Sequence, residues 1–569
     1  MSSDFNKPKD TQTDLPITVI GEGRDEWGKR YFKFAINGSQ QNLRPFSSDE
    51  IVDKPENLYK ELSNASANFF TQTAKTDLQR YLQNRKPEEP SFKVVTRLGW
   101  TNGCFVFPDE IVGKSKIPLE PSFSGLDQHM LAKYRCKGSL RDWQEHIGTL
   151  CNGNSRLMFA ASLAFTGPVL RYVKGQRSGG FQISGPGETG KTTAMMVCGS
   201  VWGCHRSPER QEKGFAESWH TTGGKVEVTA LAHNETVLLL DETKRAGKND
   251  QARAEALIST SFNLAENTER ERLNQGPVRA WRLYFLSTSN ITLPQLAAKA
   301  GVEIAEAELG RLPDIPCPAG GHGIYETLHG YSDGAALSDA LKNRCGKFFG
   351  SPAREFARRL VAERAVHPDR VRRFLRSRRR RYLSRMAAKA EALQLKPLNR
   401  ASDRFATVYA AGCLAVRYGV LPWARADLLD AILSCQLDGL SLAASPSQVV
   451  GPTVEALKTR LVQYLRDNRA RFVDLNRDRL QLGADIEAAP GYAATHKGQD
   501  WFYLAKSQVE QIIGDGPNAQ QALRQLIDDK LIAQPKRGYV VQRRIFRGGK
   551  GNQNFRWVVA FRSSFVEGA

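Results

Sequence analysis

The sequence has few cysteines and no arrangement of them that is typical of a metal site. Its nine cysteines include no Cys-x-x-Cys pair. The two groups that come closest, Cys198, Cys204 and His205 in one and Cys317 and His322 in the other, do not provide four ligands at zinc spacing. A zinc motif is therefore excluded, and reduced cytosolic thiols are expected.

Long hydrophobic runs are also missing. The longest apolar stretch, Leu157 to Leu170, is too short for a membrane span and contains Gly167-Pro168. Residues 1–14 are polar and lack the pattern of a signal peptide. There is no internal repeat and no visible nuclease, primase or polymerase constellation. We expect a soluble cytoplasmic protein with about three domains, without a membrane partner.

Acidic residues are outnumbered by basic ones. The 569 residues include 81 Lys and Arg against 60 Asp and Glu, a formal net charge of +21. This excess favours a polyanionic partner, most simply nucleic acid. It is densest between Arg370 and Arg385, where nine of sixteen residues are arginine and none is acidic. Apolar residues in this segment recur on one helical face, so the arginines form either a solvated or a phosphate-contacting surface.

The most informative motif matches the phosphate-binding pattern G-x-x-x-x-G-K-[ST]. An expected strand, 181–184, precedes it and an expected helix from 193 follows, as the motif requires. Glycines let successive N–H groups face one phosphate, while Lys191 reaches the β- and γ-phosphates and Thr192 ligates Mg²⁺. The predicted ATP-binding residues are Gly185, Pro186, Gly187, Glu188, Thr189, Gly190, Lys191, Thr192 and Thr193.

An apolar run that ends in two acids follows about fifty residues later. Residues 237–240 are Val-Leu-Leu-Leu and precede Asp241 and Glu242. Such a run suits a central strand of a parallel sheet, whose carboxyl end lies where open α/β sheets bind ligands. We expect Asp241 to hold Mg²⁺ through water and Glu242 to polarise the attacking water.

Pattern and composition divide the chain into four parts. Residues 1–135 are expected to form an α+β domain with a strand at 31–36, helix near 55–84 and a hairpin at 97–109. The α/β core occupies 136–350 and a helical region 351–441. A linker over 443–452 leads to a C-terminal domain at 453–569 that reads as helices followed by strands.

Several further segments together resemble the domain-of-unknown-function family 927, over roughly residues 90–440. They are Gly99-Trp100, Gly153-Asn154-Ser155-Arg156-Leu157, Ser200-Val201-Trp202-Gly203, Trp281-Arg282 before a strand ending Leu286-Ser287-Thr288, and Arg404-Phe405-Ala406 before Ala410-Ala411-Gly412. The family looks like a branch of the AAA+ ATPases near the minichromosome maintenance and superfamily 3 helicases. Its members often lie on prophages and other mobile elements, and some are self-loading replicative helicases.

This resemblance implies roles for three more positions. Asn290, or alternatively Thr288, would sense the γ-phosphate. Arg311 would act as an arginine finger in the ATP site of a neighbouring subunit, and Arg404 as a second sensor on a helical lid. The alternative for each arginine is a structural, core-capping role.

Two basic elements are candidates for holding nucleic acid. Residues 267–276 resemble the pore hairpin of hexameric helicases, in which Arg270 and Arg272 would grip a single strand; an exposed charged loop is the alternative. Two expected helices at 507–513 and 519–529 precede two expected strands, the order of a winged helix. Its wing tip would offer Arg543, Arg544, Arg547 and Lys550 to duplex DNA, although some winged helices bind protein instead.

The combined prediction is an α/β chain with an AAA+ P-loop ATPase core, a helical lid, an α+β N-terminal domain and a C-terminal winged helix. The expected function is an ATP- and Mg²⁺-dependent homo-hexameric DNA helicase or translocase that serves replication of a mobile element, with a primase or other replication partner. Two alternatives remain open: a DNA-binding initiator or regulator, and an anti-phage defence ATPase, both without unwinding.

Overall fold

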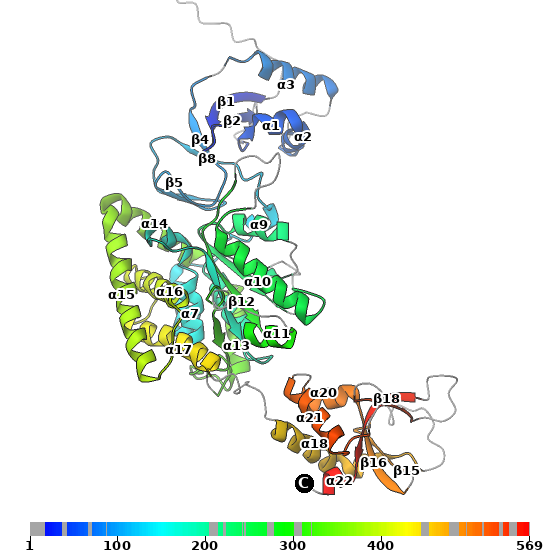
Figure 1. Ribbon diagram of the computed structural model, residues 1–569. Helices are drawn as coiled ribbons and strands as arrows, with labels where there is room; N and C mark the ends of the chain where they lie inside the picture. Colours follow the sequence, from blue (N-terminus) through cyan, green and yellow to red (C-terminus); the bar gives the residue numbers. More distant parts are fainter. Residues whose placement is uncertain are drawn as a thin grey trace, which may run out of the picture. The chain divides into compact units, whose positions relative to one another are not determined.

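The computed structural model describes the chain as two compact units, residues 1–445 and 446–569 (Figure 1). The described residues are 17–36, 43–65, 71–86, 88–203, 214–219, 223–241, 243, 246–269, 278–300, 310–319, 321–444, 454–476, 489–496, 498–514, 517–533, 539–545 and 555–567. Each unit is taken by itself below.

The N-terminal part of the first unit is a five-stranded sheet with three helices. The strand order is β3-β2-β1-β4-β8, with β1 antiparallel to β2 and parallel to β4. The expected strand at 31–36 and the expected hairpin are confirmed, and the helical stretch near 55–84 contains two helices. The elements are β1 (Ile17–Arg24), β2 (Arg30–Ile36), β3 (Phe46–Ser47), α1 (Ser48–Asp53), α2 (Pro55–Asn64), α3 (Gln72–Asn84), β4 (Phe92–Val95), β5 (Gly99–Thr101), β6 (Cys104–Val106), β7 (Ile111–Val112) and β8 (Leu119–Pro121).

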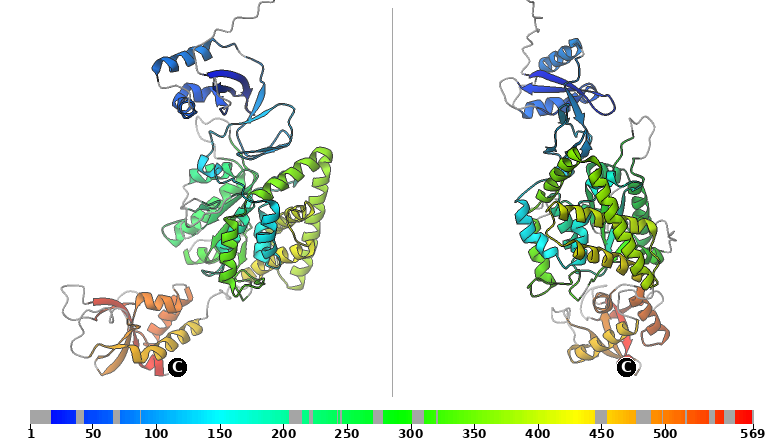
Figure 2. Two further views of the ribbon diagram at one scale, coloured as in Figure 1. Left: turned by 180° about the vertical axis from the view of Figure 1, so that it is seen from behind. Right: turned by 90° about the vertical axis from the view of Figure 1, so that its left-hand side faces the viewer.

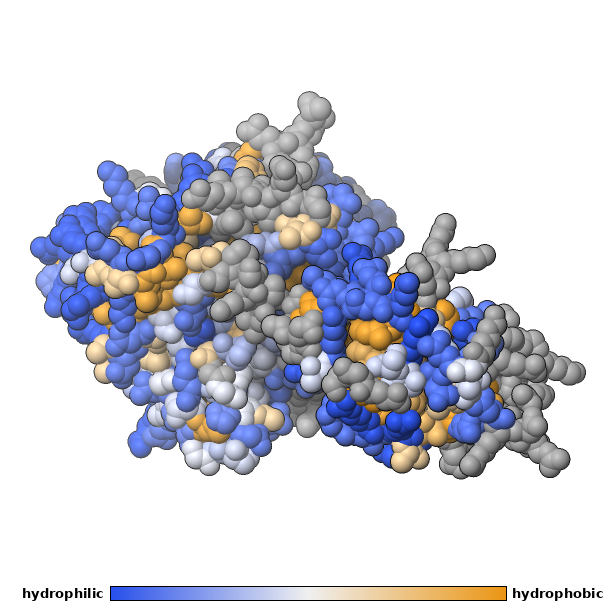
Figure 3. All heavy atoms as spheres, turned by 60° about the horizontal axis from the view of Figure 1, so that its bottom comes forward, coloured by the Kyte–Doolittle hydropathy of each residue, from blue (hydrophilic) through white to orange (hydrophobic). Residues whose placement is uncertain are grey.

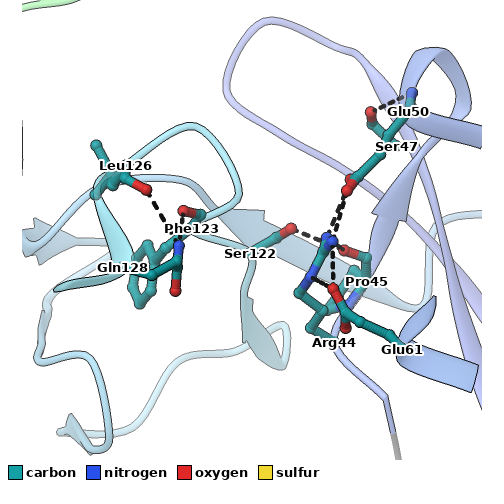
Figure 4. Close-up of polar contacts among 9 residues, drawn as sticks. All are labelled: Arg44, Pro45, Ser47, Glu50, Glu61, Ser122, Phe123, Leu126 and Gln128. Carbon is teal, nitrogen blue, oxygen red and sulfur yellow. Dashed lines mark hydrogen bonds and ion pairs between the residues drawn. The ribbon is translucent and has the colours of Figure 1, made fainter. Parts of the chain in front are cut away.

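Polar contacts connect the segment before β3 to helices α1 and α2 and to the segment after β8. The Arg44 guanidinium pairs with Glu50 and with Glu61, the latter at 2.8 Å (Figure 4). The Ser122 hydroxyl donates to the Pro45 carbonyl at 2.7 Å. Because Ser122 follows β8 and Pro45 precedes β3, this bond joins the segment after β8 to the segment before β3.

The hairpin β5–β6 joins the N-terminal part to the central sheet. The buried Glu235 carboxylate accepts the Trp100 N–H at 2.6 Å, and the Trp100 indole N–H donates to the Pro168 carbonyl at 2.8 Å. Gly99 has φ +90°, and a Cβ there would lie 2.5 Å from Glu235 Oε2. The Gly99-Trp100 motif therefore positions this junction.

The central sheet of the first unit has five parallel strands in the order β10-β11-β12-β9-β13. Its strands are β9 (Gly179–Ser184), β10 (Glu217–Ser218), β11 (Val237–Asp241), β12 (Tyr284–Ser289) and β13 (Asp314–Pro316). All six residues of β9 and of β12 are buried. This agrees with a parallel sheet covered by helices on both faces.

Helices flank this sheet on either side (Figures 1 and 2). In Figure 1, α10 and α11 lie on one side of β12, and α7 lies on the other with α16 and α15 beyond it. The helices up to residue 345 are α4 (Gln128–Leu131), α5 (Leu140–Trp143), a π-helix (Gln144–Gly148), α6 (Thr149–Cys151), α7 (Ser155–Leu163), a 3₁₀-helix (Gly167–Tyr172), α8 (Lys191–Ser200), α9 (Gly223–Ala232), α10 (Asp250–Glu266), α11 (Leu293–Ala300) and α13 (Gly334–Cys345).

The expected helical region after residue 350 is confirmed as four long helices. They are α14 (Ser351–Val366), α15 (Pro368–Ala392), α16 (Asn399–Arg417) and α17 (Arg425–Ala444). One hydrophobic cluster extends from Val95 to Cys435 and includes side chains of the sheet and of these helices. The helical region and the sheet therefore share one core.

The second unit contains a five-stranded sheet of order β14-β15-β16-β18-β17. Its elements are α18 (Val454–Asn468), a 3₁₀-helix (Arg469–Arg471), β14 (Val473–Asp474), β15 (Tyr492–His496), β16 (Gln499–Ala505), α20 (Lys506–Ile513), α21 (Pro517–Asp528), β17 (Val541–Arg544), β18 (Phe555–Arg562) and α22 (Ser564–Glu567). The two expected helices and the hairpin β17–β18 are confirmed. The order of helices before strands was wrong, because β14, β15 and β16 precede α20, and the hairpin pairs with β16 through β18.

Across the described ranges, no helix has both the length and the apolar character needed to cross a membrane. The same part of the chain holds no group of three or more His, Cys, Asp or Glu side chains arranged for a metal ion. The surface seen in Figure 3 is largely hydrophilic, with apolar side chains in separate patches.

Candidate nucleotide-binding site

The phosphate-binding loop lies between β9 and α8, as the motif predicts. Gly190 precedes α8 with φ +94°, a conformation that favours glycine. A Cβ at Gly187 would meet no atom within 4 Å, so this face of the loop is open. The loop can therefore approach a phosphate closely at the positive end of α8.

A second segment, residues 317–324, holds the loop from outside. The Cys317 N–H donates to the Ser184 carbonyl at 2.7 Å, and the Ile324 N–H donates to the Thr189 carbonyl at 2.9 Å. Gly323 has φ +74°, and a Cβ there would lie 2.5 Å from the Thr189 carbonyl oxygen. Burial raises the pKa of the Cys317 thiol, which lies against the same carbonyl. The conformation of the loop thus depends on residues more than a hundred positions away.

Lys191 points back onto its own loop. Its Nζ donates to the Gly185 carbonyl at 2.8 Å and also to the Pro186 carbonyl, and the residue is 8% exposed. A bound phosphate would replace these neutral acceptors with charged oxygens, which form stronger hydrogen bonds.

Asp241 at the end of β11 is fixed by the neighbouring strand β12. The Thr288 hydroxyl donates to Asp241 Oδ1 at 2.6 Å. Two positions after Asp241, the Thr243 hydroxyl donates to Ser289 Oγ at 3.0 Å. Since β12 lies between β9 and β11, it carries the candidate sensor residues directly between the loop and the acid.

These groups meet in one cavity of about 1110 Å³. Its wall includes residues 187–193 of the loop and helix α8, Asp241, and both sensor candidates, Thr288 and Asn290. Thr192 is exposed at the start of α8, on the same cavity as Asp241. The structure therefore brings together the predicted phosphate-binding, metal-binding and sensor positions.

Sequence reasoning missed a further part of the wall of this cavity. Residues 321–323 and 325, together with Gly334, Ser338 and Lys342 of α13, line it. The Tyr325 hydroxyl is 2.5 Å from Ser338 Oγ, which ties the segment to the helix. The run Gly320-Gly321-His322-Gly323 was the available signal, but only His322 of this run was weighed, together with Cys317, as a metal ligand.

The Gly153–Leu157 motif supports this wall from behind. Asn154 Oδ1 accepts the N–H groups of Glu326 and Thr327 at 2.9 and 3.0 Å. The Glu326 carboxylate in turn accepts the Ser155 N–H at 3.0 Å. Arg156, 1% exposed, pairs with Asp438 of α17 at 2.6 Å. The motif links α7, the cavity wall and the helical region.

Arg311 lies away from the cavity of its own chain. Its carbonyl accepts the Gly180 N–H at the start of β9, whereas the phosphate loop follows the end of that strand. Its guanidinium stacks on Phe262 of α10, 4.6 Å from the ring centroid, and that phenylalanine is 44% exposed. Arg311 is therefore placed away from the ATP site predicted within its own subunit.

Arg404 is not brought to the cavity either. It is 5% exposed, and its guanidinium donates to the carbonyls of Gly310 and Arg311 at 2.9 and 2.5 Å. Burial lowers its pKa. These contacts agree with the structural role named as the alternative to a lid sensor, because Arg404 donates to carbonyls before β13 and to that of Ser178 before β9.

Replacing Arg404 with alanine is expected to destabilise the first unit by about 2 to 4 kcal/mol, because buried carbonyls lose their donor and a cavity remains. Denaturant unfolding of the full chain measures this. The exposed Arg400→Ala is the matched control, with a change within about 0.5 kcal/mol. A stable Arg404→Ala protein with weakened ATP binding would instead support a sensor role.

The remaining predicted residues lie partly beyond the described ranges. Glu242, Arg270, Arg272, Arg547 and Lys550 are outside them, as is the side chain of Arg544. Arg543 lies in β17 opposite Arg556 of β18, and its guanidinium is 6.0 Å from the Tyr503 ring centroid.

Comparison with protein families gives a match over residues 3–280 to the family described as Domain of unknown function (DUF927). The resemblance seen in the sequence is confirmed, although the matched region begins nearer the N-terminus and ends earlier than expected. It contains the phosphate loop and Asp241. No curated protein matches the chain.

Among solved structures, the fold is similar to that of "SCCmec type IV Cch - active helicase", with a TM-score of 0.54 and 16% sequence identity. That match covers 97% of this chain and 94% of the other. A second match, the apo C-terminal region of NrS-1, has a TM-score of 0.24 and 12% identity, and covers 95% of each chain. The mixed α/β architecture is thus shared with a structure described as a helicase.

Proposed function

We propose that this protein is a ring-forming, ATP-dependent DNA helicase or translocase of the AAA+ kind, which serves replication of a mobile element. One observation carries the proposal: the phosphate loop, Asp241, Thr288 and Asn290 line one cavity of about 1110 Å³ at the carboxyl edge of a parallel sheet. Ligands bind at this edge in open α/β folds.

The chain's own groups suffice to hold a nucleoside triphosphate. Backbone N–H groups of the loop and the start of α8 face the phosphates, and Lys191 turns from its loop carbonyls to the β- and γ-phosphates. Segment 317–324 keeps the loop in the conformation that this binding requires.

The donor set also fits Mg²⁺, which prefers oxygen ligands and retains several waters. Thr192 would bind the ion directly and Asp241 through water. When bound, the ion neutralises charge on the phosphates. Thr288 fixes the Asp241 carboxylate through its 2.6 Å hydrogen bond, which makes Thr288 a positioning residue. Glu242, the next residue in the chain, would orient the attacking water.

Two further parts of the proposal concern assembly and DNA. Arg311, remote from its own cavity and next to the exposed Phe262, would complete the ATP site of the adjacent subunit in a hexamer. Arg270 and Arg272 would track a single strand in the pore. The second unit would act as a winged helix that loads the ring on duplex, with Arg543, Arg544, Arg547 and Lys550 at its wing.

A forked-DNA unwinding assay tests the function. The wild-type chain is expected to separate the strands with ATP and Mg²⁺, whereas Glu242→Gln, which keeps the phosphate contacts, is expected to bind ATP without turnover or unwinding. ATP hydrolysis without unwinding would instead favour an initiator, regulator or defence ATPase. Near-normal turnover in Glu242→Gln would contradict the assigned role of that residue.

A further inference from the structure

Helix α15 has an apolar inner side and an arginine-rich outer side. Its buried residues are Val371, Leu375, Tyr382, Met386 and Ala390. The Tyr382 hydroxyl donates to Gln436 Oε1 of α17 at 2.9 Å, which fixes the helix against its neighbours. In Figure 1, α15 forms the left edge of the unit.

Five exposed arginines of α15 have no acidic partner among the described residues, Arg381 and the following four: Arg373, Arg376, Arg380 and Arg385. We refer to these four as the α15 arginine surface. By contrast, Arg379 of the same helix pairs with Asp403 at 2.8 Å. Arg373 and Arg380 therefore form a short row on the outer side of α15, with Arg376 and Arg385 on opposite flanks, and the described carboxylates do not balance their charge.

Further cations gather beside this row. The guanidinium groups of Arg378, Arg417 and Arg425 lie 5.5, 5.0 and 5.9 Å from the centroid of the half-buried Phe374 ring. The buried Nε of Arg378 has no hydrogen-bond acceptor among the described residues. Arg417 also pairs with Glu363 at 2.7 Å, whereas Arg378 and Arg425 have no ion pair among the described residues, so an anion beside these two would be bound favourably.

We propose that the α15 arginine surface binds the phosphate backbone of duplex nucleic acid. From residue 373 to residue 385 the helix rises about 18 Å, which is long enough to contact phosphates at more than one point along the axis of a duplex. Arginine rather than lysine fits such a partner, because its planar fork binds phosphate oxygens in pairs.

Other partners fit this surface less well. Single-strand sites use aromatic side chains on which bases stack, but the two aromatic residues of α15, Phe374 and Tyr382, are half-buried and buried. A helix that lies on a membrane inserts its apolar side, whereas the apolar side of α15 is packed in the protein core. A duplex contact here would be additional to the contacts proposed for the pore and the wing. It does not require ATP hydrolysis.

The test measures binding of the full chain to a short duplex at several salt concentrations, without ATP. Changing the four arginines to glutamine should reduce the slope of log binding constant against log salt concentration by up to about 3.6, at about 0.9 per phosphate contact. It should also weaken binding at least about tenfold in 0.1 M salt. Changing them to lysine should keep most of the slope. The control variant lowers the net charge of +21 by the same amount. It changes four exposed lysines elsewhere to glutamine: Lys60, Lys114, Lys116 and Lys347.

The proposal is overturned if the control loses as much slope as the arginine variant, since bulk charge would then explain binding. It is also overturned if the arginine variant keeps duplex affinity, or loses only binding to vesicles of anionic lipid. Thermal unfolding confirms that each variant is folded. Basal ATP hydrolysis should be unchanged in all variants. A wild-type chain that hydrolyses no ATP would contradict the proposed function, whereas the duplex-binding proposal is decided by the salt slopes alone.

Discussion

Lys191→Ala is expected to reduce ATP hydrolysis by about 10²- to 10³-fold and to weaken ATP binding. The ammonium group lies in the loop between β9 and α8, where it donates to the Gly185 and Pro186 carbonyls. Its removal takes away a charged donor to the phosphates, and the loss of one such donor typically lowers the rate of a reaction by about 10²- to 10³-fold. Steady-state hydrolysis and titration with a fluorescent ATP analogue measure the two effects.

Lys347→Ala provides the matched control, since this lysine is exposed, follows α13 and does not line the cavity. Its ATP binding and hydrolysis should equal those of the wild type. If Lys191→Ala hydrolyses ATP at the wild-type rate while folded, the cavity is not the site of hydrolysis.

Arg311→Ala is expected to bind ATP normally but to hydrolyse it about 10³-fold more slowly, because an arginine finger stabilises charge on the phosphoryl group in transit. In the structure this residue is next to Phe262 and away from the cavity of its own chain. Its effect on hydrolysis should therefore depend on assembly.

Mixing Arg311→Ala with Lys191→Ala distinguishes a finger from a structural arginine. Some interfaces of a mixed ring pair an intact phosphate loop with an intact finger, so partial hydrolysis should return although each variant alone is inactive. Arg404→Ala removes a buried arginine and serves as the control. Its mixture with Lys191→Ala should hydrolyse ATP no faster than Arg404→Ala does alone. Failure of the Arg311 mixture, with assembly shown by sedimentation, would count against a role in trans.

The sequence by itself determined the local parts of the site. A phosphate loop is built from consecutive residues, so residues 185–192 with a strand before and a helix after are sufficient to specify it. The apolar run before Asp241 likewise specified a central strand, because full burial leaves no alternation of polar residues. The inner face of α15 could be read from helical periodicity in the same way.

Tertiary structure alone decided which distant segments complete the cavity. Strand order placed β12 between β9 and β11, so Thr288 reaches Asp241 across 47 positions. Segment 317–324 holds the loop through backbone contacts that side-chain patterns do not record, and residues 321–323 and α13 add to the cavity wall. Periodicity predicts that a face of α16 is buried, but not that Arg404 meets the carbonyls of Gly310 and Arg311 rather than a nucleotide. Such pairings depend on chain topology, because the physical interactions that select them act between residues far apart in sequence.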